Sequence, residues 1–395
     1  MQAIVVAKPY KFVPPRRGNL WPTLLRPVLP WFLRKEGVTS VDCRGVEKLA
    51  ASVSAGHGGM LAPNHCRPGD AFVVAALGRA VGKNVHIMAS WHIFMQGRIQ
   101  RLLLPRAGVF SVYREGLDRE ALKCAIQILT AARRPLVIFP EGVLSRHNDK
   151  LNPLMDGTAM IARAAAKHRA AAKPSGRVVV HPVGIRYYFE GNLSEAIEPM
   201  LADIERRLLW QPNPGMALVE RLAKIGGALL AQKEAEHLGI PGTGDLDGRI
   251  RDLIDHLLNP IEDAWLKGRH EGDVVGRVKL LRTALLPDLV AGQLTEAEQD
   301  RRWSLLAKLY LAQQLALYPP GYLAANPTPE RILETVERLE EDTTDRVRAV
   351  SPLRAVVSVG EAIEVSQERA RGGEDPLMVV LRERLEALLA LRQSG

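Results

Sequence analysis

The first half of the sequence alternates short apolar runs with stretches of helical periodicity, and this alternation is the strongest constraint on the fold. Six runs have the length and composition of β-strands: 40–44, 59–63, 85–88, 109–113, 136–139 and 178–185. Between them, the spacing of apolar residues predicts helices over 71–77, 117–132 and 154–167. Strands that alternate with helices of this length predict an α/β fold, with a mixed sheet flanked by helices on both faces.

The second half of the sequence has a different pattern. From about residue 193 the strand signals stop, and apolar residues recur at three- and four-residue spacing, as at Leu305, Leu309 and Ala312, and again from Leu377 to Leu389. We therefore predict three regions: an N-terminal apolar and basic segment (1–37), an α/β domain (38–192) and an all-helical C-terminal extension (193–395).

The stretch 20–34 of the N-terminal segment is apolar and contains Trp21, Trp31 and Phe32, with basic residues on both sides. Three prolines and Arg26 exclude an ordinary membrane-spanning helix here. Aromatic residues flanked by cations are typical of a segment at a lipid interface. A strap packed across the α/β domain is the alternative, and the sequence leaves both readings open.

The charge of the chain is unevenly divided. Residues 1–200 hold 28 Lys/Arg and 13 Asp/Glu, a net charge of +15, whereas residues 201–395 hold 25 and 31, a net charge of −6. A basic first half suits an anionic partner, such as a phospholipid surface or a phosphate-bearing substrate, although an ordinary solvated surface is the simpler alternative. A nucleic acid is not expected, because aromatic residues make up only 5% of the chain and no nucleic-acid-binding motif is present.

The cysteine content and the hydropathy of the sequence indicate where in the cell the protein is located. The three cysteines cannot form a disulfide framework, their spacing matches no metal site, and no apolar run reaches 18 residues. We therefore expect a cytoplasmic protein without a metal ion or a membrane-spanning helix. If the stretch 20–34 lies at a lipid interface, the protein is in peripheral contact with the inner face of the cell membrane.

The clearest chemical signal is an Asn-His-Cys-Arg-Pro-Gly-Asp sequence at 64–70, between a predicted strand and a predicted helix. The Pro-Gly turn can bring His65 and Asp70 face to face. A carboxylate that accepts one imidazole N–H fixes the tautomer and stabilises the imidazolium formed when the other nitrogen takes a proton. His65 is therefore a candidate general base oriented by Asp70. Alternatively, Asp70 only caps the following helix.

Three further strands carry residues that bear on the site, either at the strand end or within the strand. The apolar run 136–139 is followed by Pro-Glu-Gly, which places Glu141 at the carboxyl edge of the sheet, with Ser145 and Arg146 close behind. The run beginning at Gly108 ends in Arg114, whose guanidinium could bind a phosphate. The last of these strands carries a His-Pro-Val-Gly-Ile sequence at 181–185.

These four stretches together resemble the motif set of the glycerolipid acyltransferase family, in which Asn-His-x4-Asp, Gly-x-Phe-x3-Arg, Phe-Pro-Glu-Gly and Pro-Val-x-Ile follow one another in this order. The resemblance covers about residues 38–190. It implies an acyltransferase that transfers a fatty acyl group from acyl-CoA or an acyl-carrier protein to a hydroxyl of a lysophospholipid or glycerol phosphate. No bound cofactor is implied, and the expected partners are a membrane surface, the lipid acceptor and the acyl carrier.

The resemblance also assigns roles to individual residues. His65 would deprotonate the acceptor hydroxyl, which attacks the thioester directly, and Asp70 would orient His65. The acceptor and its phosphate would be bound by the remaining motif residues, namely Asn64, Arg67, Arg114, Glu141, Gly142, Ser145 and Arg146.

Two departures from the family pattern put the acceptor in doubt. Val143 and Leu144 stand where the family commonly has Thr and Arg, and Arg67 stands where it commonly has Ser. Arg67 is a candidate to replace the lost cation. The departures also keep open an alternative function, a non-catalytic acyl- or lipid-binding protein with the acyltransferase fold.

Overall fold

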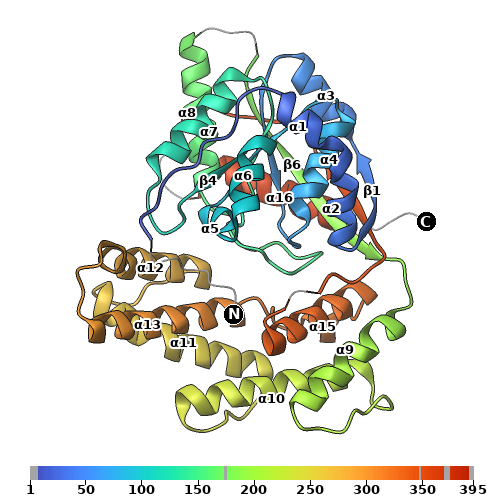
Figure 1. Ribbon diagram of the computed structural model, residues 1–395, viewed down its shortest axis with the longest axis vertical. Helices are drawn as coiled ribbons and strands as arrows, with labels where there is room; N and C mark the ends of the chain where they lie inside the picture. The colour runs from blue at the N-terminus through green and yellow to red at the C-terminus, as the bar shows by residue number, and fades with distance from the viewer. Residues whose placement is uncertain (1–7, 173–175, 347, 369–373, 391–395) are drawn as a thin grey trace. The chain divides into compact units, whose positions relative to one another are not determined.

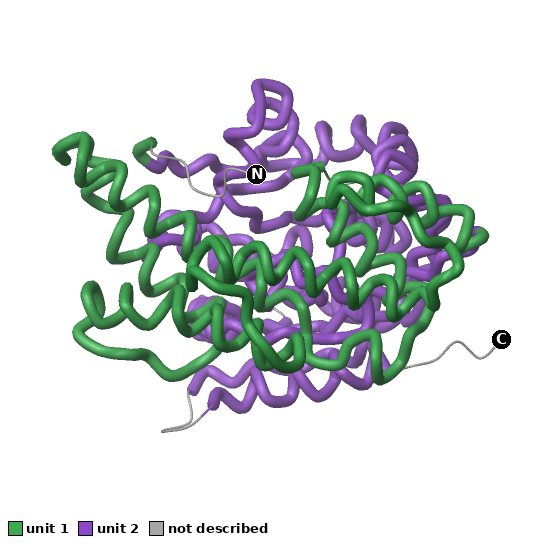
Figure 2. Tube along the Cα trace, turned by 90° about the horizontal axis from the view of Figure 1, so that it is seen from below, with its two compact units in different colours: residues 1–9, 192–348 green, residues 10–191, 349–395 purple. Residues whose placement is uncertain are grey.

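A computed structural model describes residues 8–172, 176–346, 348–368 and 374–390 (Figure 1). The chain divides into two compact units, distinguished by colour in Figure 2. Tyr10–Gly191 and Ala349–Gly395 form one, here called the α/β unit, and Asn192–Arg348 makes up most of the other, here called the helical unit. The predicted N-terminal region (1–37) begins with seven residues that lie outside the described ones.

The α/β unit is built on one eight-stranded sheet. Its strands are β1 (Val38–Arg44), β2 (Gly58–Pro63), β3 (His86–Ser90), β4 (Val109–Val112), β5 (Leu136–Val137), β6 (Val178–Phe189), β7 (Leu353–Val359) and β8 (Ile363–Glu364). Seven of them follow the order β1-β7-β6-β2-β5-β3-β4, and β8 pairs with β6. From β6 to β4 the strands are parallel, while β7 and β8 pair antiparallel with β6, which makes the sheet mixed.

Helices cover both faces of this sheet, as predicted. They are α1 (Leu20–Leu25), η1 (Arg26–Val28), α2 (Leu29–Lys35), α3 (Val46–Ser54), α4 (Asp70–Ala80), α5 (Trp91–Met95), α6 (Arg98–Ala107), α7 (Arg119–Ala131), α8 (Gly157–Ala172) and α16 (Pro376–Ala390). One face packs against α7, α8 and α16 around a core that includes Met60, Leu136 and Val180. The other face packs against α3 and α4. The predicted mixed α/β fold is therefore confirmed.

The helical unit contains α9 (Leu193–Arg207), α10 (Leu218–Leu238), α11 (Leu246–Trp265), α12 (Val274–Ala291), α13 (Glu296–Leu315), α14 (Tyr322–Ala325) and α15 (Pro329–Thr344). Several helices begin at a side-chain cap: Asp245, Asp273 and Thr295 each accept a hydrogen bond from the backbone N–H three residues later. Leucines from α11, α12 and α13 form its core.

One prediction for the C-terminal half is wrong. The all-helical reading of 193–395 holds for the helical unit and for α16, but residues 353–359 and 363–364 form β7 and β8. Their Leu-Arg-Ala-Val-Val-Ser-Val sequence is rich in β-branched residues and has strand character of its own. Because β7 pairs with β1 on one side and β6 on the other, it completes the sheet from the far end of the chain.

The N-terminal segment is partly a strap. Ser111 at the edge of the sheet donates its backbone N–H to the Val13 carbonyl at 3.1 Å, and its hydroxyl accepts the Val13 N–H at 2.8 Å. The Arg16 N–H bonds the Pro105 carbonyl at 2.8 Å. Residues 10–16 lie before the stretch 20–34 for which a strap was the alternative. The helices formed by that stretch pack on α6, α4 and β1, as a strap would, and also leave large apolar side chains exposed.

Candidate active site

The carboxyl ends of β2, β5, β3 and β4 lie at one edge of the sheet because these strands are parallel. His65 follows β2, Glu141 follows β5, and Arg114 follows β4. Open α/β sheets place their ligand sites at this edge. The topology thus collects most of the predicted site residues at one place.

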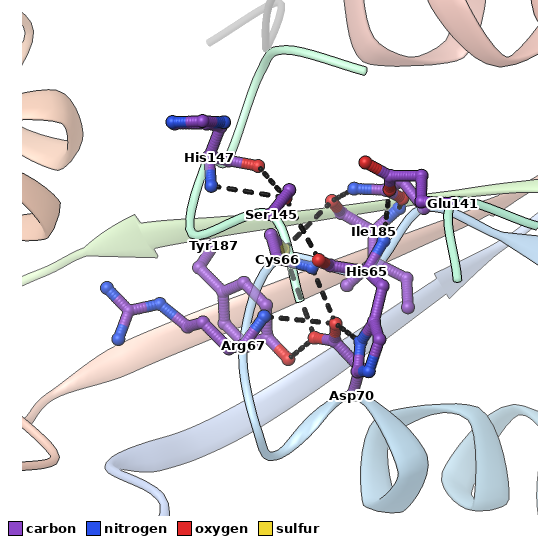
Figure 3. Close-up of polar contacts among 10 residues, drawn as sticks. His65, Cys66, Arg67, Asp70, Glu141, Ser145, His147, Ile185 and Tyr187 are labelled. Atoms are coloured by element: carbon purple, nitrogen blue, oxygen red, sulfur yellow. Dashed lines mark hydrogen bonds and ion pairs between the residues drawn. The ribbon is translucent and has the colours of Figure 1, made fainter. Parts of the chain in front are cut away.

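The His65 ring lies against the Asp70 carboxylate, as Figure 3 shows. His65 Nδ1 is 2.8 Å from Asp70 Oδ2, so in neutral His65 the proton on Nδ1 points at the carboxylate and Nε2 carries the lone pair. The His65 side chain is 24% exposed, while Asp70 is completely buried. The base can therefore be reached by a substrate, and the carboxylate cannot.

Asp70 is held by several donors besides His65. Its Oδ2 also accepts the backbone N–H groups of Cys66 at 2.8 Å and Arg67 at 3.0 Å, and its Oδ1 accepts the Tyr187 hydroxyl at 2.6 Å. Asp70 is the first residue of α4, where the helix dipole favours a negative charge. Gly69, and not Asp70, occupies the N-cap position. These contacts fix the carboxylate in the turn, so it can orient His65.

The backbone of His65 is clamped at both ends by the Pro-Glu-Gly loop. Glu141 Oε1 accepts the His65 N–H at 2.7 Å, while the Ser145 N–H and hydroxyl donate to the His65 carbonyl at 2.7 and 2.9 Å. Glu141 Oε2 also accepts the Asn152 N–H at 3.0 Å. The ring of Phe139 stacks on the imidazole at 4.1 Å between centroids. The loop after β5 therefore positions the base.

Three of the predicted substrate-binding residues have contacts within the protein. Glu141 is 1% exposed and Ser145 is fully buried, and both side chains bond to the His65 backbone. Gly142 has a φ of +67°, a conformation that favours glycine, and a Cβ there would lie 2.2 Å from Met155 Sδ. All three serve the loop that holds His65, because their polar groups and conformation are used within the protein.

Asn64 is a fourth predicted site residue with contacts inside the protein, and Asn148 is a related residue that the sequence analysis missed. The Asn64 side chain is fully buried, accepts the Ile185 N–H at 2.7 Å and donates to the Ile185 carbonyl at 3.0 Å. Asn148 makes the same pair of bonds with Tyr187, at 2.6 and 2.7 Å. Since β2 ends at Pro63, the two amides continue its hydrogen-bonding pattern along β6. These bonds attach the loop after β2 and the loop after β5 to strand β6 of the sheet.

Tyr187 was also missed, although its position carried a signal. It lies two residues after Ile185 on a strand, so the two side chains point to the same face. Helix α4, whose first residue is Asp70, packs on β7 next to β6, and the Tyr187 hydroxyl reaches Asp70. Burial raises the pKa of the Tyr187 hydroxyl well above its usual value, and the nearby Asp70 charge raises it further, so the hydroxyl remains a donor.

Three arginines remain candidates for an anionic group. Arg67 and Arg146 are partly exposed, and the Arg67 guanidinium lies 5.5 Å from the centre of the Tyr187 ring. Arg146 has a φ of +62°, an uncommon conformation for a residue with a side chain. Arg114 is half-buried after β4, and burial lowers its pKa. Because β4 is three strands from β2, these strand ends are about 14 Å apart.

Glu141 has an unusual ionisation. Burial raises its pKa from 4.5 to about 8, and the two backbone N–H donors oppose this shift only in part. In the folded protein the Glu141 carboxyl keeps its proton up to about pH 8, whereas in the unfolded chain it loses this proton near pH 4.5. This contribution to stability is present below about pH 4.5 and is lost as the pH rises through about 8.

We therefore expect the melting temperature of Glu141→Gln to fall less than that of the wild type between about pH 5 and 9. Glutamine has nearly the same shape and cannot ionise. Thermal unfolding at a series of pH values measures the effect, with the exposed Glu368→Gln as the control. Parallel curves for wild type and Glu141→Gln would contradict the raised pKa.

A family model that describes acyltransferases matches residues 40–186. This match includes His65, Asp70, Arg114 and the loop after β5. Residues 40–186 form an acyltransferase domain of the glycerolipid acyltransferase family. No curated protein matches this chain.

The acyltransferase domain gives the protein a general acyltransferase function, that of an O-acyltransferase. The helical unit lies outside the matched residues. Within the described residues, no helix combines the length and apolar character needed to cross a bilayer. Nor, in that part of the chain, could any group of three or more His, Cys, Asp or Glu side chains hold a metal ion.

Proposed function

We propose that the acyltransferase domain transfers a fatty acyl group from acyl-CoA or an acyl-carrier protein to a hydroxyl of a lysophospholipid or glycerol phosphate. The observation that carries this proposal is the pairing of a partly exposed His65 with a fully buried Asp70. This pairing provides a base whose second ring nitrogen is not bonded to the carboxylate and whose charged form the carboxylate stabilises. Neither a bound cofactor nor a metal enters the reaction.

In the proposed reaction, His65 Nε2 takes the proton of the acceptor hydroxyl while its oxygen attacks the thioester carbonyl carbon. The carbonyl π electrons move to oxygen and give a tetrahedral intermediate. When these electrons return, the C–S bond breaks, and the thiolate leaves with the proton held by His65. The Asp70 carboxylate stabilises the imidazolium throughout. The products are an ester and a free thiol, and His65 is neutral again.

The partly exposed arginines support a phosphate-bearing acceptor. Arg67 and Arg146 both interact electrostatically with Glu36, whose side chain lies beside Gly69 in the turn between His65 and Asp70. The two cations therefore lie near the base. Val143, which replaces a hydroxyl residue of the family pattern, is 4% exposed and contributes to packing. We propose that Arg67 and Arg146 bind the phosphate, with Arg114 as a third cation at the same sheet edge.

The test is a reaction of purified protein with labelled acyl-CoA or acyl-carrier protein and a panel of acceptors, analysed by mass spectrometry. The panel contains glycerol phosphate, lysophosphatidate and lysophospholipids with other headgroups. An esterified acceptor supports the proposal. Acyl-donor binding without any product would instead support the alternative of a non-catalytic acyl- or lipid-binding protein.

Removing one phosphate-binding cation should affect acceptor binding more than turnover. For Arg67→Gln we expect the acceptor KM to rise about tenfold with a small change in kcat, because one charge-assisted hydrogen bond to the phosphate is lost. Steady-state kinetics with a phosphate-bearing acceptor measure this, and the exposed Arg269→Gln is the control. An equal rise of KM for an uncharged monoacylglycerol would show that Arg67 does not bind phosphate.

A further inference from the structure

The α/β unit contains a cavity of about 250 Å³ that none of the proposed catalytic residues lines. Its walls come from the end of β1, the second halves of β6 and β7, the first turn of α3 and the last turn of α16. The described residues of the loops after β2, β4 and β5 do not contribute to it. The cavity is therefore built from different parts of the chain than the candidate active site.

The cavity lies on the opposite face of the sheet from the turn between His65 and Asp70. Arg186 and Tyr188 line it, and Tyr187 lies between them on β6. Successive side chains of a strand point to opposite faces of the sheet. The Tyr187 hydroxyl bonds Asp70 at 2.6 Å, so this turn lies on the other face. A ligand in the cavity would therefore be separated from His65 by the sheet.

A close helix crossing forms one side of the cavity. Arg44 of β1, Ser358 of β7 and Gly184 of β6 are successive partners across three strands, and all three line the cavity. At Gly184 a Cβ would lie 2.8 Å from the Leu388 Cβ of α16. Helix α16 therefore lies closely on β6, and the cavity is the space beside it over β7 and β1.

The lining of the cavity carries a positive charge. Arg44, Lys48 and Arg186 contribute three positive charges and Glu47 contributes one negative charge, which gives a net charge of +2. A phosphate monoester carries about −1.5 to −2 at pH 7, so it matches this charge more closely than a single carboxylate does. Guanidinium groups also offer paired donors that fit phosphate oxygens. The lining therefore suits a phosphate monoester.

Two of these cations have partners that an anionic ligand can replace. Arg44 pairs with Asp42 at 2.9 Å, and Lys48 pairs with Glu361 at 3.1 Å. The four side chains are between 33% and 71% exposed. Ion pairs at this exposure contribute little to stability, because water screens the charges and the side chains lose conformational freedom. Both cations can therefore turn to a phosphate at a small cost in free energy.

The third cation is held in place, and the cavity also has apolar lining. Arg186 donates from Nη1 to the Leu389 carbonyl at 3.0 Å, and its guanidinium lies 5.3 Å from the centre of the Tyr188 ring. Val356 and Leu388 add apolar groups to the same cavity. A few polar groups within apolar lining are typical of small-molecule sites, whose volumes are usually about 300–1,000 Å³. At about 250 Å³, this cavity suits a small ligand.

We propose that this cavity binds a small organic phosphate monoester. Its phosphate would be bound by Arg44, Lys48 and Arg186, and its organic group would pack against Val356 and Leu388. The ligand is not the acyl acceptor, because the cavity and the base lie on opposite faces of the sheet. The proposal does not depend on the proposed function, since binding can be measured without turnover.

Isothermal titration calorimetry of the full-length protein with monobutyl phosphate tests the proposal. This probe combines a phosphate monoester with a short apolar chain. We expect saturable binding of the probe and about tenfold or more weaker binding of inorganic phosphate, which lacks the apolar group. Butanol, which lacks the charge, should not bind.

Variants of the lining separate charge from space. Arg44→Gln/Lys48→Gln should weaken binding of monobutyl phosphate about tenfold or more, because two charge-assisted hydrogen bonds are lost. Ser358→Phe should also weaken it, because the larger side chain fills the cavity and leaves every charge in place. Lys123→Gln/Arg177→Gln, which removes two exposed cations of the same unit, is the matched control. Circular dichroism establishes that the variants are folded.

Absence of saturable binding, or equal weakening in the control variant, would overturn the proposal. So would binding that Arg67→Gln abolishes and Arg44→Gln/Lys48→Gln leaves unchanged, because the probe would then occupy the candidate active site. Acyl transfer by Arg44→Gln/Lys48→Gln should keep its acceptor KM, and a rise of about tenfold would instead make the cavity part of the acceptor site. Binding without any acyl transfer would remove the proposed function and leave this site in place.

Discussion

His65→Ala is expected to lower kcat by about 10³-fold or more while the protein remains folded. The imidazole is the proposed acceptor of the hydroxyl proton, and positioned proton transfer contributes about 10² to 10⁴ to a rate. The fold should persist because the loop is held through the His65 backbone, whose N–H and carbonyl bond Glu141 and Ser145 in any variant. Single-turnover acyl transfer and circular dichroism measure the two effects.

The exposed His168 on α8 provides the matched control, because it is a surface histidine of the same domain outside the site. We expect His168→Ala to retain wild-type turnover. Near-normal turnover of His65→Ala would remove His65 as the base, and the mechanism would have to use another group.

The second large effect is expected for Asp70→Asn, which removes the charge of this side chain and keeps its hydrogen bonds. The asparagine oxygen can still accept the N–H groups that Oδ2 accepts, and its NH₂ can donate to the Tyr187 oxygen. The geometry is therefore kept, but the imidazolium loses its counter-charge. We expect kcat to fall by about 10² to 10⁴ with little change in acceptor KM, as steady-state kinetics would measure.

Tyr187→Phe gives the comparison for this variant. It removes one hydrogen bond, donated by an uncharged hydroxyl to Oδ1, and leaves the charge of Asp70 in place. We expect a decrease in kcat of about tenfold or less. If Tyr187→Phe and Asp70→Asn lowered kcat equally, Asp70 would act by holding the turn and not by its charge.

Much of the fold could be predicted from local sequence. The strands of the first half are short apolar runs with turns on either side, and the structure places strands at all six predicted positions. The shortest, β5, covers only Leu136–Val137, although the Ile138 N–H still bonds the Leu61 carbonyl at 3.0 Å. The position of β7 was not predictable in this way, because its partners β1 and β6 are remote in sequence.

The candidate site was predictable to a different degree for each residue. The His65–Asp70 contact depends on a seven-residue strand–turn–helix sequence, so the sequence alone suggested it. The roles of Asn64, Glu141 and Ser145 depend on which backbone groups remain unpaired after β2 ends. That information exists only once β2, β5 and β6 lie side by side in the folded sheet. In the sequence, a polar motif residue that binds a ligand cannot be distinguished from one that holds a loop.

The placement of β7 affects how this protein can be made and divided. Phe189 and Leu353 are paired neighbours in the sheet, yet residues 192–348 of the helical unit lie between them in the chain. During synthesis, β1 and β6 therefore remain without the strand that joins them until the helices of this unit have also been made. A gene cut after the helical unit would encode a domain whose sheet lacks an interior strand, whereas joining residue 189 to residue 353 by a short turn would keep every strand of that sheet.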